Sequence, residues 1–193
     1  MCSAQRMRGS SGGVAPQPRS SPLPAAPATA DPACPDSSLQ PTSANLARVE
    51  ATTLCLINEQ RAQNGLPALT ANSVLQGAAL QHSRDMVANN FFSHDSSSGE
   101  DFEDRILLFN YAPPNVEWVA GENIAWGTLS LSTPDAIVVS WMNSPEHRAN
   151  VLSGDYKELG VGMEKHRSKH RKHRRAKQHG GCSGASSSAI TLC

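Results

Sequence analysis

Several features that would reveal a function directly are missing from this chain of 193 residues. No stretch approaches the roughly 20 consecutive apolar residues of a membrane-spanning helix, so we expect no membrane span. Motifs of several common enzyme classes are also missing, because the sequence contains no HExxH, no P-loop and no Rossmann glycines. The function must therefore be inferred from residues that are dispersed along the chain.

The N-terminal region lacks the apolar core of a secretory signal. Arg6 and Arg8 are typical of a basic start, and residues 28–30 have the small-x-small pattern of a cleavage site. Between them, Ser, Gly and Pro stand where roughly 7–15 apolar residues are expected. The pattern indicates either a signal peptide that is not intact in this sequence or a misassigned start in the first thirty residues.

The formal net charge of zero conceals two regions of opposite charge. Residues 165–177 hold eight of the 17 Lys and Arg residues and no acid. Residues 1–164 keep the other nine bases and all 17 acids, a net charge of −8. An acidic body argues against nucleic-acid binding by the domain, and a charge run of this kind is usually a solvated tail.

Composition divides the chain into three parts. Residues 1–43 are dominated by Pro, Ala and Ser and are predicted to be a disordered segment. Residues 164–193 are basic and then rich in Gly and Ser, and we expect a disordered tail there. Residues 44–163 remain as the predicted folded domain.

Five cysteines leave at least one without a partner inside the chain. Cys34 and Cys55 flank the start of the first predicted helix, where a bridge would tie the preceding segment to the body. Their Cα atoms should then lie roughly 4.4–6.8 Å apart. Such a bridge indicates an oxidising compartment, and the alternative is a pair of free thiols.

Hydrophobic periodicity predicts an α/β sandwich with a small sheet. His82 lies on the inner stripe of the second helix and is predicted to be a packed structural histidine. The predicted helices cover residues 44–64, 72–89, 105–109, 135–142 and 144–152, and the predicted strands cover residues 116–127 and 159–163.

Three separate segments each supply a His or Glu among small, aromatic and turn residues. The segments read FFSH, GENIAWG and SWMNSPEHRANVL, and they contain His94, Glu122, Glu146 and His147. Imidazole and carboxylate groups that converge on one cleft can bind a divalent metal or move protons. We expect Glu122 to lie within hydrogen-bonding reach of His94 or His147, since a carboxylate commonly orients such a ring.

These motifs resemble the CAP family (cysteine-rich secretory proteins, antigen 5 and pathogenesis-related 1; also called SCP-like) in its compact bacterial form. The resemblance runs from about Asn45 to Met163. It implies a three-layer α–β–α arrangement and a shallow cavity lined by a His–Glu–Glu–His tetrad. His94, Glu122 and His147 match three members of that tetrad. Ser144 stands where the remaining Glu usually lies, and Glu146 is an imperfect substitute.

The resemblance implies a secreted, extracellular and monomeric binding module for a small apolar or lipid ligand. Its cleft would be lined by His94, Glu122, Glu146 and His147. The alternative is a metal-dependent, peptidase-like hydrolase that uses the same residues. In that case Glu122 and Glu146 are the catalytic candidates, and His94 and His147 are the candidate ligands for zinc or another divalent cation.

The family pattern stops after Met163. Relatives continue into a further strand with aromatic residues, whereas this chain continues into the basic run. Charged residues cannot face a hydrophobic core, so we expect the last strand of the sheet to be missing. The strand at residues 159–163 would then have an open edge.

Overall fold

The structure, a computed structural model, describes residues 2–8, 34–111, 117–165 and 185–192. Its elements in chain order are β1 (Cys2–Arg8), α1 (Leu46–Gln63), β2 (Thr70–Ala71), α2 (Ser73–Asn89), α3 (Phe102–Leu108), β3 (Val119–Thr128), η1 (Leu129–Ser132), α4 (Pro134–Met142), α5 (Pro145–Val151), β4 (Glu158–Lys165) and β5 (Ala185–Leu192).

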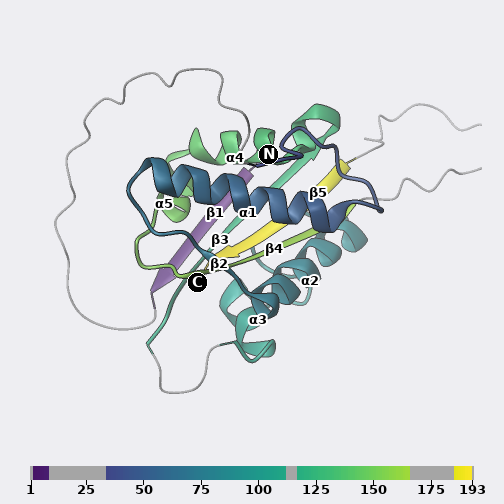
Figure 1. The fold of residues 1–193 in the computed structure, drawn as a ribbon. Helices are drawn as coiled ribbons and strands as arrows, with labels where there is room; N and C mark the ends of the chain where they lie inside the picture. The colour runs from purple at the N-terminus through teal and green to yellow at the C-terminus, as the bar shows by residue number, and fades with distance from the viewer. Residues whose placement is uncertain (1, 9–33, 112–116, 166–184, 193) are drawn as a thin grey trace, which may run out of the picture.

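The strands form one five-stranded sheet with the order β1-β3-β5-β4-β2. All neighbouring pairs are antiparallel except β2 and β4, which are parallel. Helices α1, α4 and α5 cover one face of the sheet, and α2 and α3 cover the other (Figure 1). The predicted α/β sandwich with three layers is therefore confirmed.

Strand β3 is buried on both faces, and its alternation decides which helices each side chain meets. Ala120 and Ile124 pack with the α2 and α3 side. Ala125 joins the larger core cluster, which includes Trp141 of α4. Glu122 has the same parity as Ala120 and Ile124, so the backbone directs its carboxylate toward the α2 and α3 layer.

Two glycines allow α2 to lie directly on β4. A Cβ atom at Gly160 would overlap the backbone of Leu75 and Gln76, and one at Gly162 would overlap Ala79 and Leu80. This close approach fixes the height of α2 above the sheet.

Helix α3 begins three residues earlier than its predicted start at residue 105. Asp101 caps it, since its side chain accepts a hydrogen bond from the backbone N–H of Asp104 at 2.9 Å. The apolar pattern alone did not show this start, because the first turn of the helix carries Glu103 and Asp104.

Both chain ends differ from the predicted disordered segments. β5 lies in the interior of the sheet between β3 and β4, where the last strand had been expected to be missing. β1 pairs with β3 along the other edge of that strand. The prediction of a missing strand was based on the charged residues of the basic run at 165–177. Residues 185–192 lie beyond that run, contain no charge or proline and include two β-branched residues, which suits a strand. Residues 9–33 and 166–184 lie outside the described residues.

The expected open edge of β4 is also occupied. β5 pairs with β4 along one side. On the other side the buried Glu50 carboxylate accepts the backbone N–H of Met163 at 2.9 Å. A side chain of α1 thus satisfies a backbone group that β2 is too short to reach.

Cys34 and Cys55 form a disulfide whose Cα atoms lie 5.6 Å apart, within the expected range. The bridge joins the segment before α1 to the helix itself. By the chain-entropy model it stabilises the fold by on the order of 3 kcal/mol. Residues 34–43, predicted to belong to the disordered segment, are therefore attached to the folded body.

Candidate functional site

Glu122 is the centre of the site, and its side chain has no solvent exposure. The Nδ1 atom of His94 lies 2.7 Å from Glu122 Oε1. The predicted contact between Glu122 and one of the two histidines is therefore confirmed. A carboxylate accepts, so Nδ1 is the protonated nitrogen of His94 in this contact. Its other nitrogen, Nε2, is buried without a hydrogen-bond partner among the described residues.

Arg105 of α3 holds the second oxygen of the same carboxylate. Its Nη2 atom lies 2.6 Å from Glu122 Oε2, and both side chains are almost completely buried. Its Nη1 atom donates to the carbonyl of His94 at 2.7 Å. We refer to His94, Glu122 and Arg105 as the His94 network. In this network the Arg105 guanidinium holds both the Glu122 carboxylate and the backbone of His94. The carboxylate in turn orients the His94 ring.

Sequence reasoning missed Arg105. A single arginine in a short helix is usually a surface residue, and burial of an unpaired guanidinium is costly. One signal was present, because Arg105 directly precedes Ile106 and lies one turn after Phe102 on the face that packs against the core. A charged residue on an inner helical face requires a buried partner.

His147 is buried at the start of α5, where Ser144 is its neighbour. Its Nδ1 atom lies 2.8 Å from the hydroxyl oxygen of Ser144. Ser144 stands at the position where the family resemblance implies the second Glu of the tetrad. A hydroxyl thus contacts the imidazole here, and it brings no negative charge.

Two asparagines attach α5 to β3. The Asn123 amide donates to the carbonyl of His147 at 3.1 Å, and Asn150 donates to Asn123 Oδ1 at 2.9 Å. Asn123 follows Glu122 directly, and adjacent strand residues point to opposite faces of a sheet. The His94 network therefore meets β3 from the α2 and α3 layer, whereas α5 is attached from the other layer.

The four predicted cleft residues differ in their burial. Glu146 is exposed, unlike Glu122 and His147. Within the described residues, no three of His94, Glu122, Glu146 and His147 bring their ligand atoms within 4.8 Å of one another. His94 contacts Glu122 directly, His147 lies on α5, and Glu146 is exposed to solvent.

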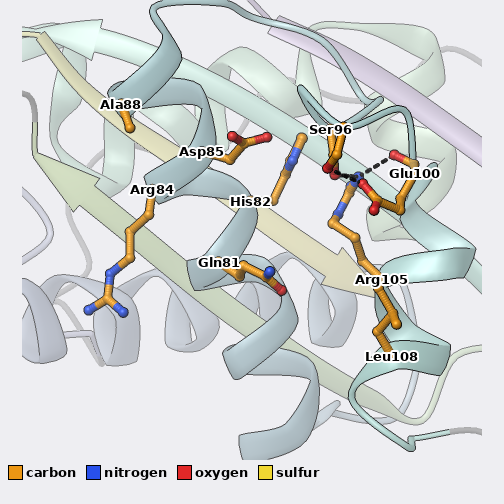
Figure 2. Close-up of a pocket in the computed structure, with 10 residues that line it drawn as sticks. Gln81, His82, Arg84, Asp85, Ala88, Ser96, Glu100, Arg105 and Leu108 are labelled. Carbon is orange, nitrogen blue, oxygen red and sulfur yellow. Dashed lines mark hydrogen bonds between the residues drawn. The ribbon is translucent and has the colours of Figure 1, made fainter.

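A hollow of about 340 Å³ lies beside the His94 network, between α2, the 96–100 loop and α3. Figure 2 shows Arg105 extending from α3 toward Ser96 and Glu100, and its Nη1 atom donates to the Ser96 hydroxyl at 3.2 Å and to the Glu100 carbonyl at 3.3 Å. None of the four predicted cleft residues lines this hollow. Its lining residues are Gln81, His82, Arg84, Asp85, Ala88, Ser96, Ser98, Glu100, Arg105 and Leu108.

His82 forms the floor between this hollow and the core. Its ring has no solvent exposure, packs edge-on against Phe91, and lies with Nε2 2.8 Å from the carbonyl of Ser93. Burial lowers the pKa of His82, and the nearby Glu122 carboxylate opposes this effect only in part. A neutral ring in a packed position agrees with the predicted structural role.

The sequence pattern of the CAP family, described as the cysteine-rich secretory protein family, matches residues 54–174, which is more than half of the chain. This chain belongs to the CAP family. The family resemblance seen in the motifs is thereby confirmed, and the His94 network lies within the matched region.

Two proteins of Bacillus subtilis (strain 168) are similar to this CAP chain. YkwD, an uncharacterized protein, is 36% identical over 107 residues, which are 55% of this chain and 39% of YkwD. YlbC, an uncharacterized membrane protein, is 36% identical over 117 residues, 60% of this chain and 32% of YlbC. The chain thus spans well under half the length of either relative. Among its own described helices, none is long and apolar enough to cross a bilayer.

Solved structures agree on the fold. An extracellular protein of Bacillus anthracis (strain Ames) that contains an SCP domain matches with a TM-score of 0.56 and 27% identity, over 77% of this chain and 43% of that one. An outer surface protein of Borrelia burgdorferi matches with a TM-score of 0.54 and 17% identity, over 72% of this chain and 86% of that one. The latter likeness shows the fold alone.

Proposed function

We propose that this chain is an extracellular CAP binding module that holds a small apolar or lipid-like ligand by its polar group at His94. The observation that carries the proposal is the commitment of Glu122, whose two oxygens are occupied by His94 and Arg105. A carboxylate held in this way orients a ring and is not available as a base. The orphaned Nε2 atom of His94 is then an acceptor that a ligand hydroxyl can satisfy.

The proposed location rests on two observations. The Cys34–Cys55 disulfide is stable in an oxidising compartment and rare in a reducing one. The similar SCP-domain protein of Bacillus anthracis is described as extracellular. Both support export of this chain.

Binding of a fluorescent sterol and a fluorescent fatty acid to the full chain tests the ligand class. We expect saturable binding of at least one probe and a dissociation constant raised about tenfold or more by His94→Ala, which equals a loss of about 1.4 kcal/mol. Glu146→Gln alters an exposed carboxylate and should leave the affinity unchanged. Equal affinity of the wild type and the His94→Ala protein would show that His94 does not contribute to binding. Absence of binding by both probes would exclude the proposed ligand class.

The metal-dependent hydrolase is the second candidate, and the His94–Glu122 contact favours it. A carboxylate on one nitrogen of an imidazole commonly orients the other nitrogen toward a metal ion. Calorimetric titration of zinc into the oxidised full chain separates the two candidates. Binding heat that is present in the wild type and disappears in a His94→Ala/His147→Ala double variant would support the hydrolase. Identical titrations of the wild type and the double variant would favour the binding module.

A further inference from the structure

A second group of ligating side chains lies apart from the His94 network, at the disulfide. The sulfur atoms of Cys34 and Cys55 and a carboxylate oxygen of Glu59 all lie within 4.8 Å of one another. Cys55 and Glu59 are four residues apart on α1, so they share one face of that helix. Cys34 approaches this face from the preceding segment and is completely buried.

We propose that reduction of the disulfide turns Cys34, Cys55 and Glu59 into a binding site for zinc or another thiophilic divalent cation. A dithiol reductant supplies two electrons and two protons, the sulfur–sulfur bond breaks, and each cysteine becomes a thiol while the reductant closes its own disulfide. Metal binding then displaces the two thiol protons to water, and two thiolates and one carboxylate remain as ligands.

The donor set and the spacing both suit zinc. Zinc prefers tetrahedral sites with sulfur at about 2.3 Å and carboxylate oxygen at about 2.0–2.2 Å, which places the ligand atoms roughly 3.5–3.8 Å apart. The three donor atoms already lie within 4.8 Å of one another, so a short separation of the two sulfur atoms after reduction brings the set to this spacing. Water would occupy the fourth position. Two sulfur ligands disfavour magnesium and calcium, which prefer oxygen.

Contacts that do not involve sulfur hold the two halves of the site together. The Thr52 hydroxyl donates to the carbonyl of Pro35 at 2.9 Å, and Arg48 pairs with Asp36 at 2.6 Å. Farther along, the backbone N–H of Asp135 donates to the carbonyl of Ser37 at 3.0 Å. These contacts keep Cys34 beside α1 after the bridge opens, so the ligands are preorganised for the metal.

Cobalt titration of the full chain tests the site, because cobalt reports thiolate ligands by charge-transfer absorption. The parent protein carries Cys2→Ser, Cys182→Ser and Cys193→Ser, so that only the two relevant cysteines remain. It is reduced with dithiothreitol, which is then removed under nitrogen. We expect one thiolate-bound cobalt per chain, displaced by zinc, no such band in the oxidised protein, and tighter binding at higher pH.

Glu59→Gln distinguishes this site from a simple pair of thiols. It should weaken cobalt binding about tenfold or more, since even residues that only support a ligand commonly contribute that much. Glu117→Gln, which alters an exposed acid elsewhere, should leave the affinity unchanged. The proposal is overturned by absence of the band in the reduced parent, by equal affinities of the two variants, or by a circular dichroism spectrum that shows the reduced parent to be unfolded.

Discussion

At the residue scale, Glu122 and Arg105 depend on each other. Both side chains are almost completely removed from water, which is costly for two charges. The cost is offset because the carboxylate accepts from two charged or polar donors, while the guanidinium also donates to the carbonyls of His94 and Glu100. The pair therefore holds the position of His94, and removal of one partner leaves the charge of the other buried and unpaired.

Arg105→Ala should lower the free energy of unfolding by about 3–5 kcal/mol, because it leaves the Glu122 charge buried without its partner. Urea denaturation of the purified full chain measures the effect. Arg84→Ala is the matched control, since Arg84 pairs with Glu164 at the surface with 64% of its side chain exposed. Its cost should stay within about 0–1 kcal/mol.

A double-mutant cycle separates the pair from the general cost of truncation. In an Arg105→Ala/Glu122→Gln protein the uncompensated charge is gone, so the two changes should cost clearly less together than the sum of the single effects. Additive costs would contradict the view that the two side chains stabilise each other.

The sequence revealed His94 and Glu122 but did not reveal what holds them. Their motifs contain aromatic and glycine neighbours that mark a cleft, and a carboxylate was expected beside an imidazole. Arg105 lies in a segment with an ordinary helical pattern, and its partner is 17 positions away. Long-range pairing of a buried charge leaves almost no local trace in a single sequence.

At the element scale, β4 shows how a short neighbouring strand is supplemented by side chains. β2 pairs with β4 over two residues, and the Glu50 carboxylate then accepts a backbone N–H of β4 farther along the same edge. Burial raises the pKa of the Glu50 carboxyl, although the hydrogen bonds from Met163 and Gln76 act in the opposite direction. The edge of β4 is therefore sensitive to pH.

Glu50→Gln should remove a pH-dependent loss of stability. Because the folded-state pKa of Glu50 lies above its unfolded value of about 4.5, the folded protein binds this proton more tightly, and stability falls as pH rises through that window. Unfolding free energies of the wild type and the Gln variant, measured from pH 4 to pH 8, should therefore diverge in favour of the variant as the pH increases.

Glu50→Ala provides the structural comparison for that experiment. It leaves the backbone N–H of Met163 without an acceptor, which should cost about 1–3 kcal/mol relative to Glu50→Gln at every pH. Glu117→Gln, an exposed acid, should reproduce the pH dependence of the wild type. If the Glu50→Gln and wild-type curves run parallel, the raised pKa contributes nothing to the pH dependence.

Helices and strands with strong periodicity were predicted well, and the chain ends were not. The pattern of Leu159, Val161 and Met163 identified β4, and Asn72 identified the start of α2, where its side chain accepts from Val74 and Leu75. β5 is a run of small residues that ends in Ile, Thr and Leu. Such a run has weak alternation, so its strand forms because two neighbours offer backbone partners on both sides.

At the scale of the whole molecule, β5 joins the two halves of the sheet. Its residues pair with β3, which carries Glu122, and with β4, on which α2 lies. Thr191 is the pairing partner of both Glu122 and Gly160. The position of the His94 network relative to α2 therefore depends on a strand that lies more than 60 residues away in sequence from Glu122.

Proline in β5 tests this arrangement. Ile190 pairs with Asn123 on one side and with Val161 on the other, so it lies in the interior of the sheet. Ile190→Pro removes a backbone donor and restricts φ, and it should lower the free energy of unfolding by about 3 kcal/mol or more. Ile190→Val keeps the donor and the β-branched shape, and its cost should stay below about 1.5 kcal/mol. Thermal and urea denaturation measure both variants. If the proline variant unfolds at the same midpoint as the valine variant, residues 185–192 do not form a strand between β3 and β4, and the sheet is held together without them.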